Sequence, residues 1–327
     1  MKNLFYPFSM LIGILLVVFL QYSFQFYFFY IEQSQLFLWD SAYFLESLAL
    51  PGGLSRWLSE SVIQFYAYPY IGALSTGLWV TAVALLTGNL LEKISRASWM
   101  AMLGWFPAIS LLLISVDFNY YQSGIVAFLL SLLAASLYVR IPVFLIRLSV
   151  GIVMLPLLAW WGGTVYMLFA VMSLLYELSC QQSMKQKAAS AGMLVVAAII
   201  AIYFYHSCLV DTWAKTISPS FYFVSKLKPG KMIYVSWGSL LFLVGLAGLI
   251  NQKKHAITGK KQTMTWFVVS FFVLMAIYMG LMKFVDKKSL RFMELDYYSR
   301  TGQWNSIEQA CQGKLTNFLY MSILCRA

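Results

Sequence analysis

Residues 66–91 read YAYPYIGALSTGLWVTAVALLTGNLL and contain no charged side chain. At roughly 1.5 Å per residue, about 20 helical residues cross the ~30 Å hydrocarbon core of a bilayer. A helix that is apolar on all sides needs an apolar environment on all sides. This segment therefore predicts a transmembrane α-helix.

The composition of the whole chain supports the same environment. Of the 327 residues, 61% are hydrophobic and 11% are charged, whereas roughly a quarter of the residues in a soluble domain are charged. The mean hydropathy is +0.74. Aromatic residues make up 17% of the chain, which suits a surface that meets both lipid tails and headgroups. We expect the lipid bilayer to be the main partner of the chain.

The same criterion, applied along the chain, predicts about nine helices and an all-α fold, a polytopic transmembrane helical bundle. The expected ranges are 8–30, 66–91, 98–116, 121–139, 142–160, 163–179, 189–209, 232–250 and 264–285. We expect residues 1–285 to form this membrane domain and residues 286–327 to form a helical tail. The first span is too long for the apolar region of a signal peptide and lacks a cleavage motif.

Lysine and arginine are distributed unevenly between the connecting segments. If the N-terminus lies inside, the inner segments carry a clear excess of cations over acids, whereas the outer segments are nearly balanced. Because short cytoplasmic loops retain cations, we expect a cytoplasmic N-terminus and, after nine crossings, a periplasmic C-terminus. The cluster of Lys226, Lys228 and Lys231 departs from this rule, since it follows the seventh predicted helix on the outer side.

Two classes of function are disfavoured by composition. The net charge is +11, but the cations lie in small clusters between apolar runs, so we expect no nucleic acid as a partner. Two histidines and four cysteines without a CxxC pair give no spacing typical of zinc or haem. The sequence identifies neither a metal nor another cofactor.

The first outer loop, residues 31–65, contains two amphipathic stretches on either side of Pro51-Gly52-Gly53. Apolar residues recur at helical spacing in each stretch, and Gly and Pro punctuate the connection. We expect two short helices that lie in the membrane interface with their apolar faces towards the acyl chains. Their charged residues would then lie at the outer membrane surface.

Two carboxylates of this loop, Asp40 and Glu46, are candidates for a general base or a metal ligand, since a carboxylate beside apolar surface acquires a raised pKa. The alternative is that both residues occupy the solvated faces of interfacial helices, with Asp40 near a helix start. Asp117, in the second outer loop, is a further acid at the same membrane face. It could cooperate with Asp40, or it could cap the fourth predicted helix.

Ionisable residues are scarce within the predicted spans. Arg147 and Glu177 lie near predicted cytoplasmic ends, where we expect their side chains to snorkel towards water. Ion-coupled transporters usually place ionisable groups near the middle of the bilayer. The sequence shows no such path, which disfavours a transporter.

The tail contains the pattern Tyr298-x-x-x-Gly302-x-Trp304-x-x-Ile307. It resembles the helix–turn–helix of a tetratricopeptide repeat, in which aromatic residues flank a glycine turn. Fewer than two units are present, although about three are needed to bury their faces, so we expect a truncated or continuing repeat region. The alternative is an amphipathic tail on the membrane surface. Cys311 and Cys325 could form a disulfide in an oxidising compartment.

Several motifs together resemble a known bacterial family. They comprise the segment Leu48–Leu54 with its Pro-Gly-Gly, the aromatic residues at 64–69, and the tail motifs around Tyr297, Gly302 and Thr316. On these motifs the chain resembles domain of unknown function 6057, a family of multi-pass proteins. The resemblance implies a bacterial inner membrane and no particular activity.

A weaker resemblance concerns architecture. A transmembrane helix, a long outer loop with two juxtamembrane helices and an acid, and a second acidic outer loop are similar to the membrane glycosyltransferases of the GT-C fold. This resemblance implies that Asp40 is the base, that Asp117 assists it or contacts a metal, and that a polyprenyl phosphate carries the sugar. Arg56 or the cluster of Lys226, Lys228 and Lys231 would bind the carrier phosphate. Similarity of fold alone is an associational argument.

Two hypotheses of different classes follow. The first is glycosyl transfer from a polyprenyl-phosphate-linked sugar at the periplasmic face. The second is a non-enzymatic scaffold for envelope assembly, whose exported tail binds a partner protein.

Overall fold

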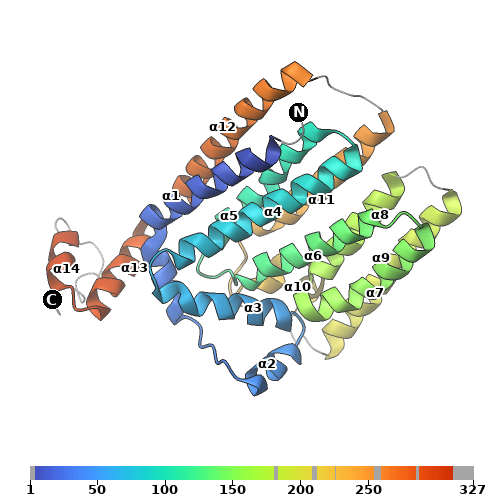
Figure 1. The fold of residues 1–327 in the computed structure, drawn as a ribbon. Helices are drawn as coiled ribbons and strands as arrows, with labels where there is room; N and C mark the ends of the chain where they lie inside the picture. The colour runs from blue at the N-terminus through green and yellow to red at the C-terminus, as the bar shows by residue number, and fades with distance from the viewer. Residues whose placement is uncertain are drawn as a thin grey trace.

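The computed structural model describes residues 4–179, 183–207, 212–224, 226–253, 259–284 and 287–311. These residues form fourteen α-helices and three short 3₁₀-helices (Figure 1). Within the described part of the chain, the sole β-type pairing is an isolated bridge between Tyr120 and Phe223. The prediction of an all-α fold is confirmed.

Seven helical segments are long and apolar enough to cross a membrane, as expected of a multi-pass membrane protein. They are α1 (Phe5–Gln33), α4 (Ile71–Ser95), η2 with α5 (Ser98–Gly104 and Trp105–Ser115), α6 (Ser123–Arg140), α7 (Phe144–Gly162), α9 (Met184–Ser207) and α11 (Lys231–Lys253). The other two predicted spans correspond to α8 (Val165–Ser179) and α12 (Gly259–Phe284), whose apolar parts are shorter. Each of the nine predicted spans therefore contains an apolar helix.

The first outer loop forms the two expected short helices, α2 (Ser41–Leu48) and α3 (Gly53–Ile63), followed by η1 (Gln64–Ala67). Between α9 and α11 lie α10 (Trp213–Ile217) and η3 (Pro219–Tyr222). The tail contains α13 (Lys287–Arg300) and α14 (Trp304–Ala310), joined by a turn in which Gly302 has φ +69°. A residue with this φ is usually glycine, so the glycine turn suggested by the repeat-like pattern is present.

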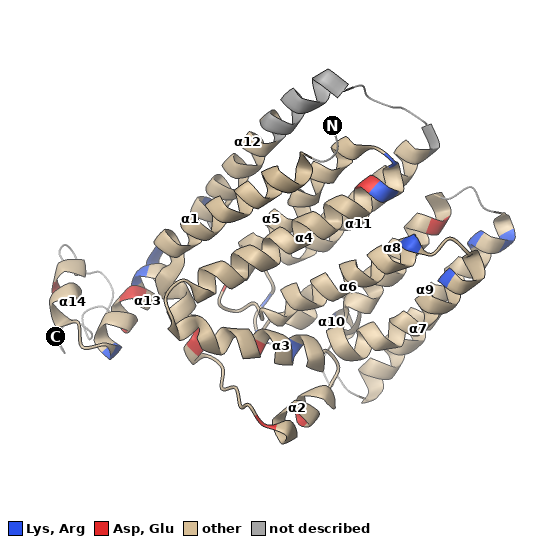
Figure 2. Cartoon of the chain, viewed as in Figure 1, with Lys and Arg blue, Asp and Glu red and all other residues tan. Residues whose placement is uncertain are grey.

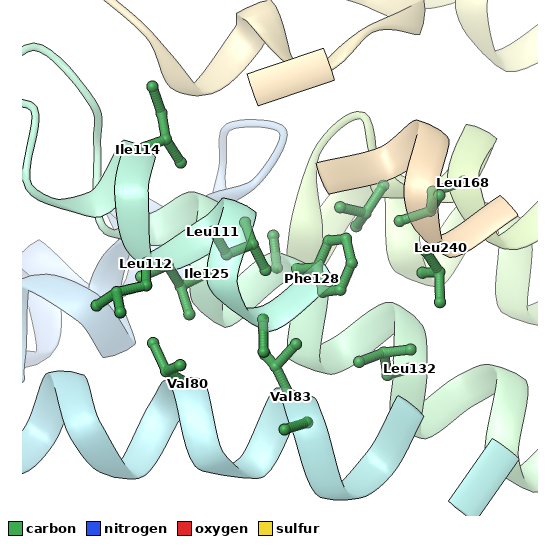
Figure 3. Packing of buried hydrophobic residues seen from close by; sticks show 14 of the residues in the cluster. Val80, Val83, Leu111, Leu112, Ile114, Ile125, Phe128, Leu132, Leu168 and Leu240 are labelled. Atoms are coloured by element: carbon green, nitrogen blue, oxygen red, sulfur yellow. The ribbon is translucent and has the colours of Figure 1, made fainter. Parts of the chain in front are cut away.

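The core of the bundle lies among α4, α5, α6, α8 and α11. Figure 3 shows Val80 and Val83 of α4 facing Leu111 of α5 and Phe128 of α6, and all four side chains are buried. Helix α1 packs closely against α4, where a Cβ on Gly77 would collide with Val17. Small residues allow helices to approach closely in a membrane. There the association of helices depends on van der Waals packing, because lipid tails are as apolar as the side chains.

One ion pair lies inside the bundle and corrects an expectation. Arg147 of α7 and Glu177 of α8 do not extend separately towards water. Nε and Nη2 of Arg147 donate to the two carboxylate oxygens of Glu177 at 2.6 and 2.9 Å, and both side chains are buried. The hydroxyl of Tyr138, on α6, donates to the same carboxylate at 2.8 Å. Three helices are therefore joined by a network in which both charges are hydrogen-bonded, as a buried pair requires.

This network predicts a non-additive mutational effect. Arg147→Gln should lower the free energy of unfolding by about 3–5 kcal/mol, because it removes the guanidinium group that bonds to both carboxylate oxygens of the buried Glu177. Adding Glu177→Gln should recover much of that loss, since the buried carboxylate is then replaced by a neutral amide. Unfolding of the purified variants in detergent measures both effects, with Lys185→Gln, an exposed cation near the same end of the bundle, as the control. Equal or greater loss in the double variant would contradict the prediction.

Candidate functional site

The two ends of the bundle differ in charge (Figure 2). One end, which we name the basic end, carries cations where α4 and α6 finish and α9 begins. Lys93, Arg96, Arg140 and Lys185 are exposed, and Lys187 is partly exposed. The opposite end, which we name the loop end, holds α2, α3, the α5–α6 loop and η3. Four acids of these segments, Asp40, Glu46, Glu60 and Asp117, lie there.

The Pro-Gly-Gly turn between α2 and α3 is fixed to the end of α7. The backbone N–H of Gly52 donates to the carbonyl of Trp160 at 2.8 Å, and Nε1 of Trp160 donates to the carbonyl of Leu48 at 2.8 Å. Gly52 has φ +77°, a conformation that L side chains rarely adopt. A Cβ on Gly53 would collide with the carbonyl of Ser47. Both glycines are thus required by local geometry.

A second connection ties η3 to the same place. The hydroxyl of Tyr222 donates to the carbonyl of Gly162 at 2.5 Å and accepts from the backbone N–H of Val165 at 3.3 Å. The carbonyl of Tyr222 in turn accepts from the backbone N–H of Tyr121 at 2.9 Å. One buried tyrosine therefore joins the α7–α8 turn to the α5–α6 loop.

These connections enclose a cavity of about 500 Å³ at the loop end. Its wall combines hydroxyl, amide, charged, aromatic and aliphatic groups. The lining residues are Ser34, Gln35, Leu36, Leu50, Pro51, Gly52, Gly53, Arg56, Ser59, Glu60, Tyr121, Ser123, Phe221 and Tyr222. The volume lies within the range of ~300–1,000 Å³ that is typical of small-molecule sites.

The charged groups of the cavity form a network on α3 and α2. Nε of Arg56 donates to Oε1 of Glu60 at 2.8 Å, and the hydroxyl of Tyr43 donates to Oε2 of Glu60 at 2.6 Å. Glu60 is only 8% exposed, whereas the side chain of Arg56 is 57% exposed. Among the described residues, the two terminal guanidinium nitrogens of Arg56 have no hydrogen-bond partner.

The network also changes the acid–base properties of its members. The hydrogen bond to Glu60 raises the pKa of Arg56 above its ordinary value. Partial burial, followed by the bond to Glu60, raises the pKa of Tyr43. Tyr43 therefore keeps its proton and Arg56 keeps its charge over the physiological range of pH.

Of the residues predicted from sequence, Arg56 lines the cavity. Asp40 precedes the first residue of α2 and Glu46 lies within it, and both are exposed. Helix α2 packs on α3, which places both acids at the loop end. Neither acid is among the residues that line the cavity. The side chain of Asp40 makes no hydrogen bond that caps α2.

Asp117 and the lysine cluster are also absent from the cavity wall. Oδ1 of Asp117 accepts from the backbone N–H and the side-chain Nδ2 of Asn119, both at 3.0 Å. Asp117 thus stabilises its own turn and does not cap α6, which Gln122 precedes. The three lysines, Lys226, Lys228 and Lys231, are exposed between η3 and the start of α11.

Four further residues of the site, Glu60, Tyr43, Tyr121 and Tyr222, were not predicted from the sequence. The i, i+4 spacing of Arg56 and Glu60 on an amphipathic stretch is a signal for an ion pair on one helix face. Tyr121 and Tyr222 lie a hundred residues apart, and no local pattern brings them together. Among the described residues, no group of three or more His, Cys, Asp or Glu side chains lies close enough to hold a metal ion.

Comparisons with other proteins place the chain in a family without assigning its chemistry. A search of curated proteins and a search of solved structures return no match. The profile of a family of unknown function, DUF6057, matches residues 1–327. The chain belongs to this family.

Proposed function

We propose that the chain transfers a glycosyl group from a polyprenyl-phosphate-linked sugar, and that the reaction takes place in the cavity at the loop end. The observation that carries the proposal is the position of Arg56, which lines a cavity large enough for a sugar phosphate and whose terminal nitrogens have no hydrogen-bond partner among the described residues. The planar guanidinium group matches two oxygens of a phosphate. Gly52 and Gly53, at the N-terminal end of α3, line the same cavity, and the positive end of a helix dipole favours an anion there.

The reaction requires a leaving group and a proton acceptor. A hydroxyl oxygen of the acceptor attacks the anomeric carbon while the bond from that carbon to the phosphate oxygen breaks, and the phosphate leaves with the electron pair. Arg56 would stabilise the negative charge on the leaving phosphate. The hydroxyl proton passes to a carboxylate. Glu60 is the carboxylate in the cavity wall, and Asp40, Glu46 and Asp117 are the neighbouring candidates at the same end.

Charge distribution supports an orientation with the loop end in the periplasm of a bacterial inner membrane. The exposed cations near the ends of α4 and α6 and the start of α9 would face the cytoplasm, in agreement with the positive-inside rule. Helix α1 runs from the basic end to the loop end (Figure 1), which would leave the N-terminus in the cytoplasm. The tail would be exported, because Tyr297 of α13 stacks on Phe29, near the loop end of α1, with ring centroids 4.7 Å apart.

Substitution of Arg56 tests recognition of the phosphate. Arg56→Gln should weaken binding of a polyprenyl phosphate about tenfold or more, since a hydrogen bond to a charged group contributes roughly 1.5–3 kcal/mol. Native mass spectrometry of the purified protein in detergent measures the binding. Arg140→Gln, which removes an exposed cation at the basic end, is the matched control. Equal binding by the wild type and Arg56→Gln would remove the main support for the proposal.

The proton acceptor is tested by a second set of variants in proteoliposomes that contain a polyprenyl-phosphate sugar and candidate acceptors. Glu60→Gln should reduce transfer by about 10²-fold or more, in keeping with the size of general-base effects, while lipid binding is retained. Asp40→Asn, Glu46→Gln and Asp117→Asn, assayed in parallel, identify any role of the residues outside the cavity wall. Transfer that is unchanged in all four variants would exclude a carboxylate mechanism.

The scaffold hypothesis has one observation in its favour. Helices α13 and α14 pack around a small separate cluster of Leu295, Ile307 and Cys311, and Trp304 on α14 is 42% exposed. Exposed tryptophan is common at protein interfaces. If the tail binds an envelope protein, deletion of residues 290–327 should abolish co-purification of that protein, and Trp304→Ala should reduce it. Unchanged recovery with both variants would count against a scaffold.

A further inference from the structure

We infer that the hydrocarbon chain of the ligand leaves the cavity across Leu36 and Leu50, so that the ligand enters sideways from the lipid leaflet. The inference rests on the proposed function, because it takes a phosphate-linked lipid as the ligand. It adds a binding site for the chain and names two residues that determine the preference for a long chain.

The first observation is that one part of the cavity wall is aliphatic and open. Leu36 is 80% exposed and Leu50 is 53% exposed, and both line the cavity. They belong to different segments, since Leu36 follows the end of α1 and Leu50 precedes the Pro-Gly-Gly turn. The charged part of the wall consists of Arg56 and Glu60 on α3. A cavity with one charged and one exposed aliphatic side fits an amphiphile better than a soluble anion.

The second observation concerns depth in the membrane. Trp160 and Trp161, at the end of α7, are both partly exposed, and tryptophan at helix ends is typical of the membrane–water interface. Trp160 is hydrogen-bonded to both ends of the segment that contains Leu50, through the carbonyl of Leu48 and the N–H of Gly52. Leu50 is therefore held near the level at which headgroups meet acyl chains.

The third observation is size. A cavity of about 500 Å³ is comparable to sites that enclose drug-sized ligands and accommodates a sugar phosphate. A long polyprenyl chain does not fit in the same volume and must lie outside it. The two exposed leucines provide an apolar exit that leads from Arg56 to the lipid phase, where the chain is already soluble.

The test compares chain length rather than affinity alone. Binding of a long-chain polyprenyl phosphate and of geranyl phosphate is measured by native mass spectrometry in detergent. We expect the wild type to prefer the longer chain, and Leu36→Ser with Leu50→Ser to reduce that preference about tenfold through lost apolar contact. Leu45→Ser is the matched control, since Leu45 is 65% exposed on α2 but does not line the cavity. Arg56→Gln should weaken both ligands equally and leave the preference unchanged.

The outcomes separate the two proposals. If Arg56→Gln weakens both ligands but the leucine variants keep the wild-type preference, the exit across Leu36 and Leu50 is wrong and the phosphate site stands. If Leu45→Ser loses the preference for the longer chain to the same extent, the proposed exit is also wrong, because the loss would then reflect general contact with lipid. If the wild type binds neither ligand, or if Arg56→Gln has no effect, the phosphate site itself is wrong and the inference falls with it.

Discussion

Hydrocarbon offers no hydrogen-bond partner to a peptide group, and this constraint determines most of the structure. In the bilayer each backbone N–H and C=O must be satisfied within the protein, which leaves the helix as the spanning element for a chain of this composition. The same constraint acts on side chains, so that Arg147 and Glu177 are buried only as a hydrogen-bonded pair. At the loop end, segments between helices bond to one another through their backbone groups.

The membrane helices could be predicted because their signal is local. The apolar run at 66–91 overlaps the helix Ile71–Ser95, and the run at 8–30 lies within Phe5–Gln33. The punctuation at Pro51-Gly52-Gly53 separated α2 from α3 correctly for the same reason. The observed helix ends differ from the predicted ends by several residues. A helix can continue beyond its apolar segment into the membrane interface until a cap or a turn ends it.

The contacts between distant segments could not be predicted in the same way. Arg147 and Glu177 are thirty residues apart, and each one alone resembles a residue that snorkels at a helix end. Their pairing depends on the tight turn at Gly163, with φ +84°, which folds α8 back along α7. Likewise, the cavity depends on the bond from Tyr222 to Gly162. Arg56 could therefore be predicted as a candidate, but its bond to Glu60 and the positions of Asp40, Glu46 and Asp117 outside the cavity wall could not.

Two arginines of this chain show how partners decide the role of a residue. In Arg147, Nε and Nη2 bond to Glu177 and Nη1 bonds to the carbonyl of Ile141, so each nitrogen has a protein partner and the charge serves the packing of α7 on α8. In Arg56, Glu60 occupies Nε and fixes the direction of the side chain. Its two terminal nitrogens have no hydrogen-bond partner in the part of the chain that the structure describes. If Arg56 binds a phosphate as proposed, a guanidinium group whose direction is already fixed would do so at little further cost in side-chain entropy.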